Sequence, residues 1–148
     1  MNEPLKRGSS SPTHLLHRAG QIADDLFSRA IGDLGLTARQ YVVLSLVDGL
    51  DDPSQTTLSE ISGIDRSTLA DVVRRLVGRG LLTRRRTRSD ARMYAVRITP
   101  EGKSVIEKAQ PIAKNVDAAV LEALSDTERE TFAQLLRKVV SQSGVLDE

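Results

Sequence analysis

Basic side chains are concentrated in one part of this chain. Between Arg66 and Lys103 there are eleven basic residues against three acidic ones, a local balance of +8, whereas the other residues carry −7 and the net charge is +1. Arginine attracts nucleic-acid phosphates irrespective of sequence. A basic block is often only a solvated face. Here, however, the charges alternate with regularly spaced apolar residues and turn residues, which indicates that folded structure displays them.

An amphipathic helix must position the first of these charges, and Asp65 is expected to be its N-cap. The buried face follows the i, i+3, i+4, i+7 pattern and consists of Leu69, Val72, Val73 and Leu76. The opposite face carries Ser67, Asp71, Arg74 and Arg75, with Arg66 and Thr68 at its flanks. A shorter helix precedes it, opened by a Thr57–Glu60 capping box and ending near Gly63. This spacing is typical of a helix-turn-helix.

A β-hairpin is predicted after the amphipathic helix. Residues 81–86 and 93–99 have strand character, and the residues between them are polar and rich in arginine. In the second strand Tyr94, Val96 and Ile98 alternate with more polar positions, as expected of a half-buried strand. The hairpin should therefore pack one face on the helices and project its tip beyond them.

The helix and the hairpin together predict DNA binding. An α-helix fits the major groove of B-DNA, and arginines at a projecting tip can enter the adjacent minor groove, where negative potential concentrates. At that tip Asp90 can hold Arg92 in one rotamer through a charge-assisted hydrogen bond, although an ordinary turn aspartate is the alternative reading. The candidate DNA-contacting residues are Arg66, Ser67, Thr68, Arg74, Arg75, Arg86, Arg88, Asp90 and Arg92.

Helices are predicted on both sides of this unit. A long amphipathic helix covers about residues 13–34, and Pro111 is expected to kink the fifth helix. Helix starts are indicated by the capping boxes Thr37–Gln40 and Ser125–Glu128 and by the pair Thr99–Pro100. The expected fold is mainly α with a small β-hairpin wing. It divides into a flexible tail (1–12), a helical dimerisation region (13–35 and 100–143) and a winged helix-turn-helix domain (36–99).

Composition excludes several other classes of protein. The chain has no cysteine and two histidines, which argues against disulfide frameworks, thiol chemistry and metal hydrolases. No nucleophile–base pair, catalytic carboxylate pair or phosphate-binding glycine loop is present, so we expect no enzyme activity, no cofactor and no metal. No apolar run is long enough to span a membrane, and no signal peptide is visible. A cytoplasmic protein without a membrane partner is expected.

The stretch from Asp65 to Gly102 resembles the MarR family of winged-helix bacterial transcription regulators. The residues that carry the resemblance are Asp65-Arg66-Ser67-Thr68-Leu69, Leu76-Val77-Gly78-Arg79-Gly80-Leu81-Leu82, Asp90-Ala91-Arg92 and Ile98-Thr99-Pro100-Glu101-Gly102. Ile98 stands where leucine is usual in the family, and Ala91 stands where a second arginine is frequent. The resemblance covers about residues 13–143. It implies that Arg92, beside Asp90, enters the minor groove.

The resemblance also implies a repressor that a small phenolic or other aromatic ligand, such as an aromatic acid or its thioester, releases from DNA. The candidate ligand-binding residues are His14, His17, Arg18, Arg39 and Tyr41. Exposed histidines and a core tyrosine are the plainer alternatives. The apolar stripes of the first, fifth and sixth helices independently predict a homodimer on a pseudo-palindromic operator, the alternative being a monomer with a satellite core. The alternative function is a winged-helix protein-interaction module, in which the arginines would meet an acidic partner.

Overall fold

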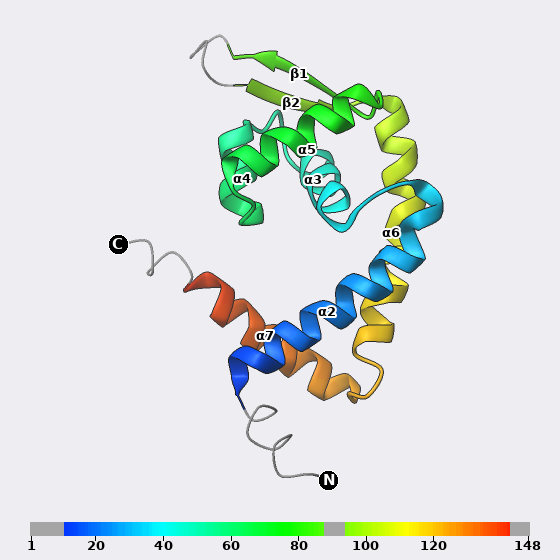
Figure 1. Ribbon diagram of the computed structural model, residues 1–148, viewed down its shortest axis with the longest axis vertical. Helices are drawn as coiled ribbons and strands as arrows, with labels where there is room; N and C mark the ends of the chain where they lie inside the picture. The colour runs from blue at the N-terminus through cyan, green and yellow to red at the C-terminus, as the bar shows by residue number, and fades with distance from the viewer. Residues whose placement is uncertain (1–10, 88–93, 143–148) are drawn as a thin grey trace.

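The computed structural model describes residues 11–87 and 94–142, and it is mainly helical with one antiparallel hairpin, as predicted. The elements in chain order are α2 (Pro12–Ile31), the 3-10 turn η1 (Gly32–Leu34), α3 (Ala38–Gly49), α4 (Gln55–Ser62), α5 (Arg66–Gly78), β1 (Leu82–Arg86), β2 (Tyr94–Ile98), α6 (Pro100–Val120) and α7 (Asp126–Ser141). Helices α3, α4 and α5 form one lobe with the hairpin, which we call the winged lobe (Figure 1). Helices α2 and α7 and the end of α6 form an arm below it.

Local capping signals define most helix starts. Thr37 and Gln40 exchange side-chain and backbone hydrogen bonds at the start of α3, and Ser125 and Glu128 do the same for α7, so both predicted capping boxes are confirmed. Helix α2 begins slightly earlier than expected. Pro12 is already helical and Ser11 accepts a hydrogen bond from the His14 amide at 3.4 Å, so these two residues belong to the helix start and not to a tail.

The predicted capping box at Thr57 is wrong. Helix α4 starts one turn earlier, with Ser54 as N-cap accepting from the Thr57 amide at 3.0 Å. The start of α4 is determined by tertiary contacts with β2. Ser54 forms a β-bridge with Ala95, and the carbonyl of Pro53 accepts from the Val96 amide at 2.9 Å. This extended run beside β2 ends at Ser54, so the helix begins directly after it.

The hairpin pairs Leu82 with Ile98 and Arg86 with Tyr94 at its two ends. Val96 is fully buried on the inner face, and Tyr94 and Ile98 are half-buried, in agreement with the predicted alternation. The tip of the hairpin, residues 88–93, lies outside the described residues. The buried side chains Leu82 and Val96 therefore hold the hairpin on the winged lobe.

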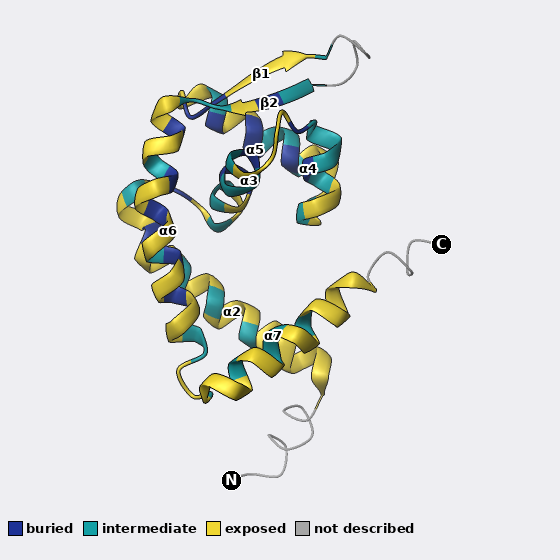
Figure 2. Ribbon diagram, turned by 180° about the vertical axis from the view of Figure 1, so that it is seen from behind, coloured by how far each residue is buried: buried dark blue, intermediate teal, exposed yellow. Residues whose placement is uncertain are grey.

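The core lies in the winged lobe and along its contact with α6 (Figure 2). Its largest fully buried side chains are Ile31, Leu44, Leu58, Leu69, Leu76, Leu82 and Ile106. Each contributes roughly 1.5–3 kcal/mol by leaving water. Helix α6 buries Ile106, Ala109, Ala113 and Val116, because it contacts both α2 and the winged lobe.

Helix α7 contributes no buried residue. Its apolar side chains Leu135 and Val139 are more than half exposed, and Leu15, Leu16 and Ile22 on α2 are also exposed. Figure 2 shows the arm as largely exposed in contrast to the winged lobe. Within residues 11–87 and 94–142, no helix combines the length and the apolar character needed to cross a membrane.

Candidate nucleic-acid interface

The start of α5 is organised by one carboxylate. Asp65 accepts hydrogen bonds from the Thr68 amide at 3.0 Å and from the Ser67 hydroxyl at 2.9 Å. These bonds, those from Thr68 first, lower the pKa of Asp65 to about 2. Because the Ser67 proton is engaged by Asp65, its exposed oxygen is left to accept a hydrogen bond. Such an acceptor suits the amino group of cytosine or adenine in the major groove.

The outer face of α5 carries two arginines that share one partner. Asp71 forms ion pairs with Arg74 and with Arg75, the latter at 2.9 Å from Nε to Oδ2. The hydrogen bond from Arg75 is the main cause of the lowered pKa of Asp71. Both arginine side chains remain about 70% exposed. A guanidinium group has five N–H donors, so each retains donors for an outside partner while Asp71 limits its rotamers.

The hairpin holds a second pair of arginines. The guanidinium carbon of Arg84 lies 4.6 Å from the ring centroid of Tyr94, and that of Arg86 lies 5.8 Å from it. Nε of Arg86 also donates to the Tyr94 hydroxyl at 3.3 Å, which is the main cause of the lowered pKa of Tyr94. Arg84 reaches further, to Gln55 at the start of α4, at 3.5 Å. The tyrosine ring therefore orders two cations on the exposed part of β1.

Sequence reasoning found only part of this set. Arg86 was among the candidates, whereas Arg84 and the role of Tyr94 were missed, although the cross-strand pairing of Arg86 with Tyr94 follows from the hairpin register. Arg66 and Ser67 are exposed and Thr68 is half-buried, so the structure gathers the α5 candidates around the start and outer face of one helix. Arg88, Asp90 and Arg92 lie outside the described residues, and their roles remain predictions.

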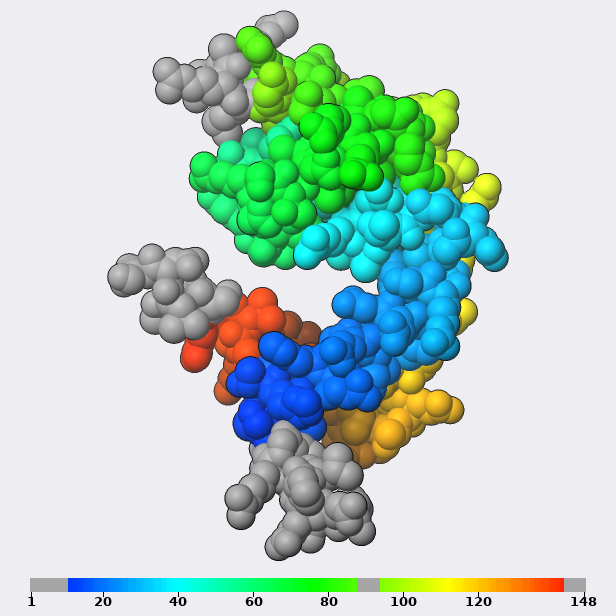
Figure 3. Space-filling model, viewed as in Figure 1, coloured from blue at the N-terminus to red at the C-terminus, as the bar shows by residue number. Residues whose placement is uncertain are grey.

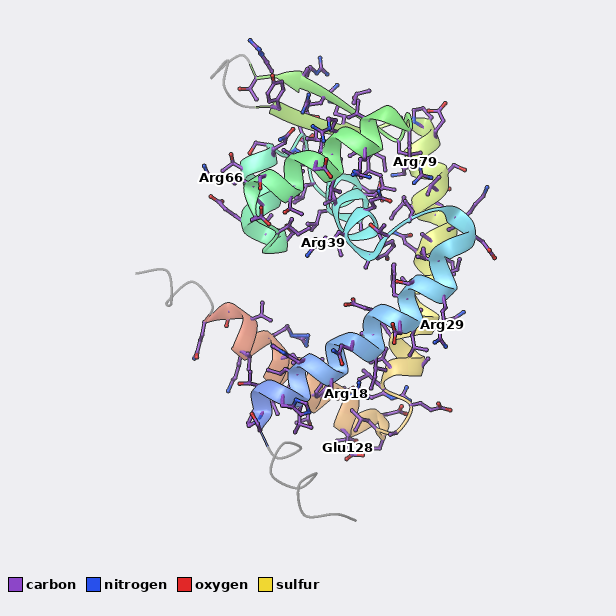
Figure 4. The ribbon with its side chains drawn as sticks, viewed as in Figure 1. Arg18, Arg29, Arg39, Arg66, Arg79 and Glu128 are labelled. Atoms are coloured by element: carbon purple, nitrogen blue, oxygen red, sulfur yellow. The ribbon has the colours of Figure 1, made fainter. Side chains whose placement is uncertain are left out.

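A cleft of about 500 Å³ lies where α2, α3 and α5 meet. Its charged lining consists of Asp24, Arg39, Asp71 and Arg75, and polar lining is added by Ser28, Thr37, Gln40 and Thr68. Figure 3 shows the surface hollowed between the winged lobe and the arm. Of the predicted ligand-binding residues, only Arg39 lines this cleft. It lies on the side of the winged lobe that faces the arm (Figure 4).

The other ligand candidates lie elsewhere. His14, His17 and Arg18 are exposed near the start of α2, where Arg18 donates to Gln21 at 3.1 Å, and Figure 4 shows Arg18 on the arm, apart from Arg39. Tyr41 packs against Phe27 with ring centroids 5.2 Å apart and joins the edge of the core. Burial raises its pKa. The structure thus separates the five candidates into three places.

The sequence and the fold of this chain are both similar to those of known proteins. The sequence profile of the MarR family matches residues 36–94. The transcriptional regulator HosA of Escherichia coli is 36% identical over 106 residues, which are 72% of this chain and 78% of HosA. The structure of BpsR from Bordetella bronchiseptica, a protein whose DNA binding is regulated by 6-hydroxynicotinic acid, matches with a TM-score of 0.85 at 32% identity over 89% of this chain and 94% of BpsR. A variant of Escherichia coli MarR in complex with operator DNA matches with a TM-score of 0.79 at 25% identity, over 93% and 94% of the two chains.

Proposed function

Because the chain belongs to the MarR family of transcriptional regulators, we propose that it binds DNA sequence-specifically and represses transcription from a pseudo-palindromic operator as a homodimer. The observation that carries this proposal is the set of ordered, exposed arginines that α5 and β1 present on one lobe. Arginines restrained by Asp71 and Tyr94 lose less side-chain freedom on docking than free ones would.

In this proposal α5 enters the major groove. Ser67 and Thr68 approach base edges, since they lie in the first turn of the helix. Arg66, Arg74 and Arg75 contact guanine or flanking phosphates, and Arg86 with its neighbour Arg84 contacts the backbone beside the groove. The tip residues Arg88 and Arg92, with Asp90 as support, read the minor groove.

Salt dependence tests the DNA-binding proposal. The duplex is one that the protein retains from a random-sequence pool, and an unrelated duplex of equal length is the control. With roughly 6–8 phosphate contacts per dimer, log K should fall with log salt at a slope of about −6. A protein that retains no duplex from the pool would contradict the proposal and favour an acidic protein as the partner of these arginines.

The homodimer part of the proposal is supported by the exposed apolar side chains of α2 and α7. A helical interface of the size that obligate dimers use, roughly 2,000 Å² or more, would cover them. Two-fold symmetry would then place two copies of α5 about 34–36 Å apart, one helical turn of DNA.

The effector part of the proposal is that a small aromatic acid, or its thioester, binds in the cleft between α2, α3 and α5 and releases the DNA. Arg39 and Arg75 supply two guanidinium groups to this cleft, and paired N–H donors recognise a carboxylate well. The likeness to BpsR supports an aromatic acid as the ligand class. A ligand on Arg75 would also disturb its pair with Asp71 on the DNA-facing helix.

Release experiments test this site. 6-Hydroxynicotinate, benzoate and a benzoyl thioester are added to the protein–duplex complex, and release is followed by fluorescence anisotropy. Arg39→Gln should raise the concentration needed for release by about tenfold, the effect of roughly 1.4 kcal/mol. Arg29→Gln is the matched control, because Arg29 is exposed on α2 outside the cleft. An unchanged release curve for Arg39→Gln would remove the cleft from the proposal.

A further inference from the structure

The loop between α3 and α4 lies against the outer edge of the hairpin. The Pro53 carbonyl accepts from the Val96 amide at 2.9 Å, and Ser54 is bridged to Ala95. Strand β2 is therefore held on one side by β1 and on the other by this loop. Any side chain that joins the loop to β2 also helps to set the direction of the whole hairpin.

Asp52 is such a side chain, and its backbone is unusual. Its φ of 42° makes it the one non-glycine residue with positive φ in the part of the chain that the structure describes. This left-handed region is costly for most residues and is tolerated by aspartate and asparagine. Residues kept in such a conformation are often functional, because the surrounding structure must hold them there.

The side chain of Asp52 reaches β2. Both of its oxygens accept from Arg97: Nη2 donates to Oδ2 at 2.6 Å, and Nε donates to Oδ1. The two residues are 45 positions apart in sequence. This paired geometry fixes direction as well as distance. Close by, Lys103 at the start of α6 donates to Asp48 of α3 at 2.8 Å, so two ion pairs join the α3 side of the lobe to the exit of the hairpin.

Such a pair does little for folding. The side chains of Arg97 and Asp52 are 53% and 41% exposed, and ion pairs this exposed contribute little to stability. The pair can nevertheless determine the orientation of the hairpin. Arg84, Arg85 and Arg86 lie on β1 directly across from β2, so the angle of the hairpin to α5 determines whether they and the α5 arginines can reach one duplex together.

We propose that Asp52 is a positioning residue for DNA binding: by holding Arg97 it fixes the hairpin, and with it Arg84, Arg85 and Arg86, in the orientation to α5 that a duplex requires. The inference rests on the proposed function. It predicts the direction in which DNA affinity changes when the carboxylate is removed. A carboxylate near phosphates is repulsive, so removing one should strengthen DNA binding through charge alone. If Asp52 positions the hairpin, its removal should instead weaken DNA binding.

The test compares Asp52→Asn with Asp51→Asn on the duplex retained from the random pool. Both variants lose one negative charge, and asparagine tolerates the backbone of Asp52. Asp51 is an exposed neighbour whose charge acts on Arg97 less than that of Asp52 does, and it forms no ion pair with any described residue. Asp52→Asn should weaken binding by about three- to tenfold, the range expected when groups must be ordered on docking. Asp51→Asn should bind as the wild type does or more tightly, and the thermal midpoints of all three proteins should agree.

A double-mutant cycle separates positioning from charge. Arg97→Gln alone should weaken binding, whereas in the Asp52→Asn background it should have a smaller effect, because the pair is already broken. Arg97→Lys keeps the charge but loses the paired donors; it should also weaken binding, and it gives an independent reading if Asp52→Asn does not fold. Binding by Asp52→Asn that equals or exceeds the wild type would overturn the inference. A wild-type protein that retains no duplex would instead overturn the proposed function.

Discussion

Arg79 and Gly35, 44 residues apart in sequence, are joined by a hydrogen bond of 2.7 Å from Nη1 of the arginine to the carbonyl oxygen of the glycine. Nη2 donates in addition to the Leu34 carbonyl at 3.3 Å. Arg79 is the C-cap of α5, and Gly35, with φ of 67°, ends the turn between α2 and α3. The end of the proposed recognition helix is therefore tied to the junction of the arm with the winged lobe.

Arg79→Met tests how much this tie contributes. The variant keeps an apolar stem and loses both hydrogen bonds, so the free energy of unfolding in urea should fall by about 0.5–1.5 kcal/mol. Lys114→Met, a loss of one exposed positive charge on α6, should change it by less than about 0.5 kcal/mol. Equal stability of the two variants would show that solvent replaces the bonds of Arg79 without cost.

The cap of α5 predicts a pH effect of known sign. The pKa of Asp65 is lowered from 3.8 to about 2, so its contribution to stability is complete above pH 3.8 and is lost as pH falls through about 2. Asp65→Asn keeps a capping side chain that does not titrate. The difference in unfolding free energy between the wild type and this variant should be constant above pH 3.8 and change in favour of the variant as pH falls toward 2. A difference independent of pH would contradict the assignment.

Leu135→Glu tests the homodimer. Leu135 is 55% exposed on α7, and a carboxylate there would be buried without a partner in any dimer that covers this face. Sedimentation should show a monomer at micromolar concentration, and affinity for a duplex with two half-sites should fall more than affinity for one half-site. Gln134→Glu, an exposed neighbour, should leave the assembly unchanged. A dimeric Leu135→Glu would place the interface elsewhere.

Two glycines predict opposite effects of the same substitution. A Cβ at Gly102 would overlap the Leu81 carbonyl oxygen and lie 2.8 Å from Cγ1 of Ile98, whereas a Cβ at Gly20 meets nothing within 4 Å. Gly102→Ala should therefore destabilise the protein by about 1–3 kcal/mol, as overpacking does. Gly20→Ala, within α2, should stabilise it by roughly 0.5–1 kcal/mol. Thermal unfolding should show a lower midpoint for Gly102→Ala and a higher midpoint for Gly20→Ala than for the wild type.

Signals local in sequence were sufficient for most of the secondary structure. The buried face of α5, the alternation of β2 and the boxes at Thr37 and Ser125 depend on residues within two turns of each other, so the pattern itself carries the information. Local signals did not identify the N-cap of α4, which was predicted at Thr57 and lies at Ser54. Ser54 and Thr57 are both residue types that cap helices, and the β-bridge of Ser54 to Ala95, 41 positions away in the chain, favours Ser54.

The sequence alone determined that this is a helical protein with a basic helix-turn-helix and a hairpin, because periodicity, capping and charge clustering are short-range properties. Only the tertiary structure decided which charges are held by which partners. The pairs Asp52–Arg97 and Arg79–Gly35 join positions more than 40 residues apart. Their formation depends on how the hairpin and the arm pack on the core, and packing is a property of the whole chain that no local pattern encodes.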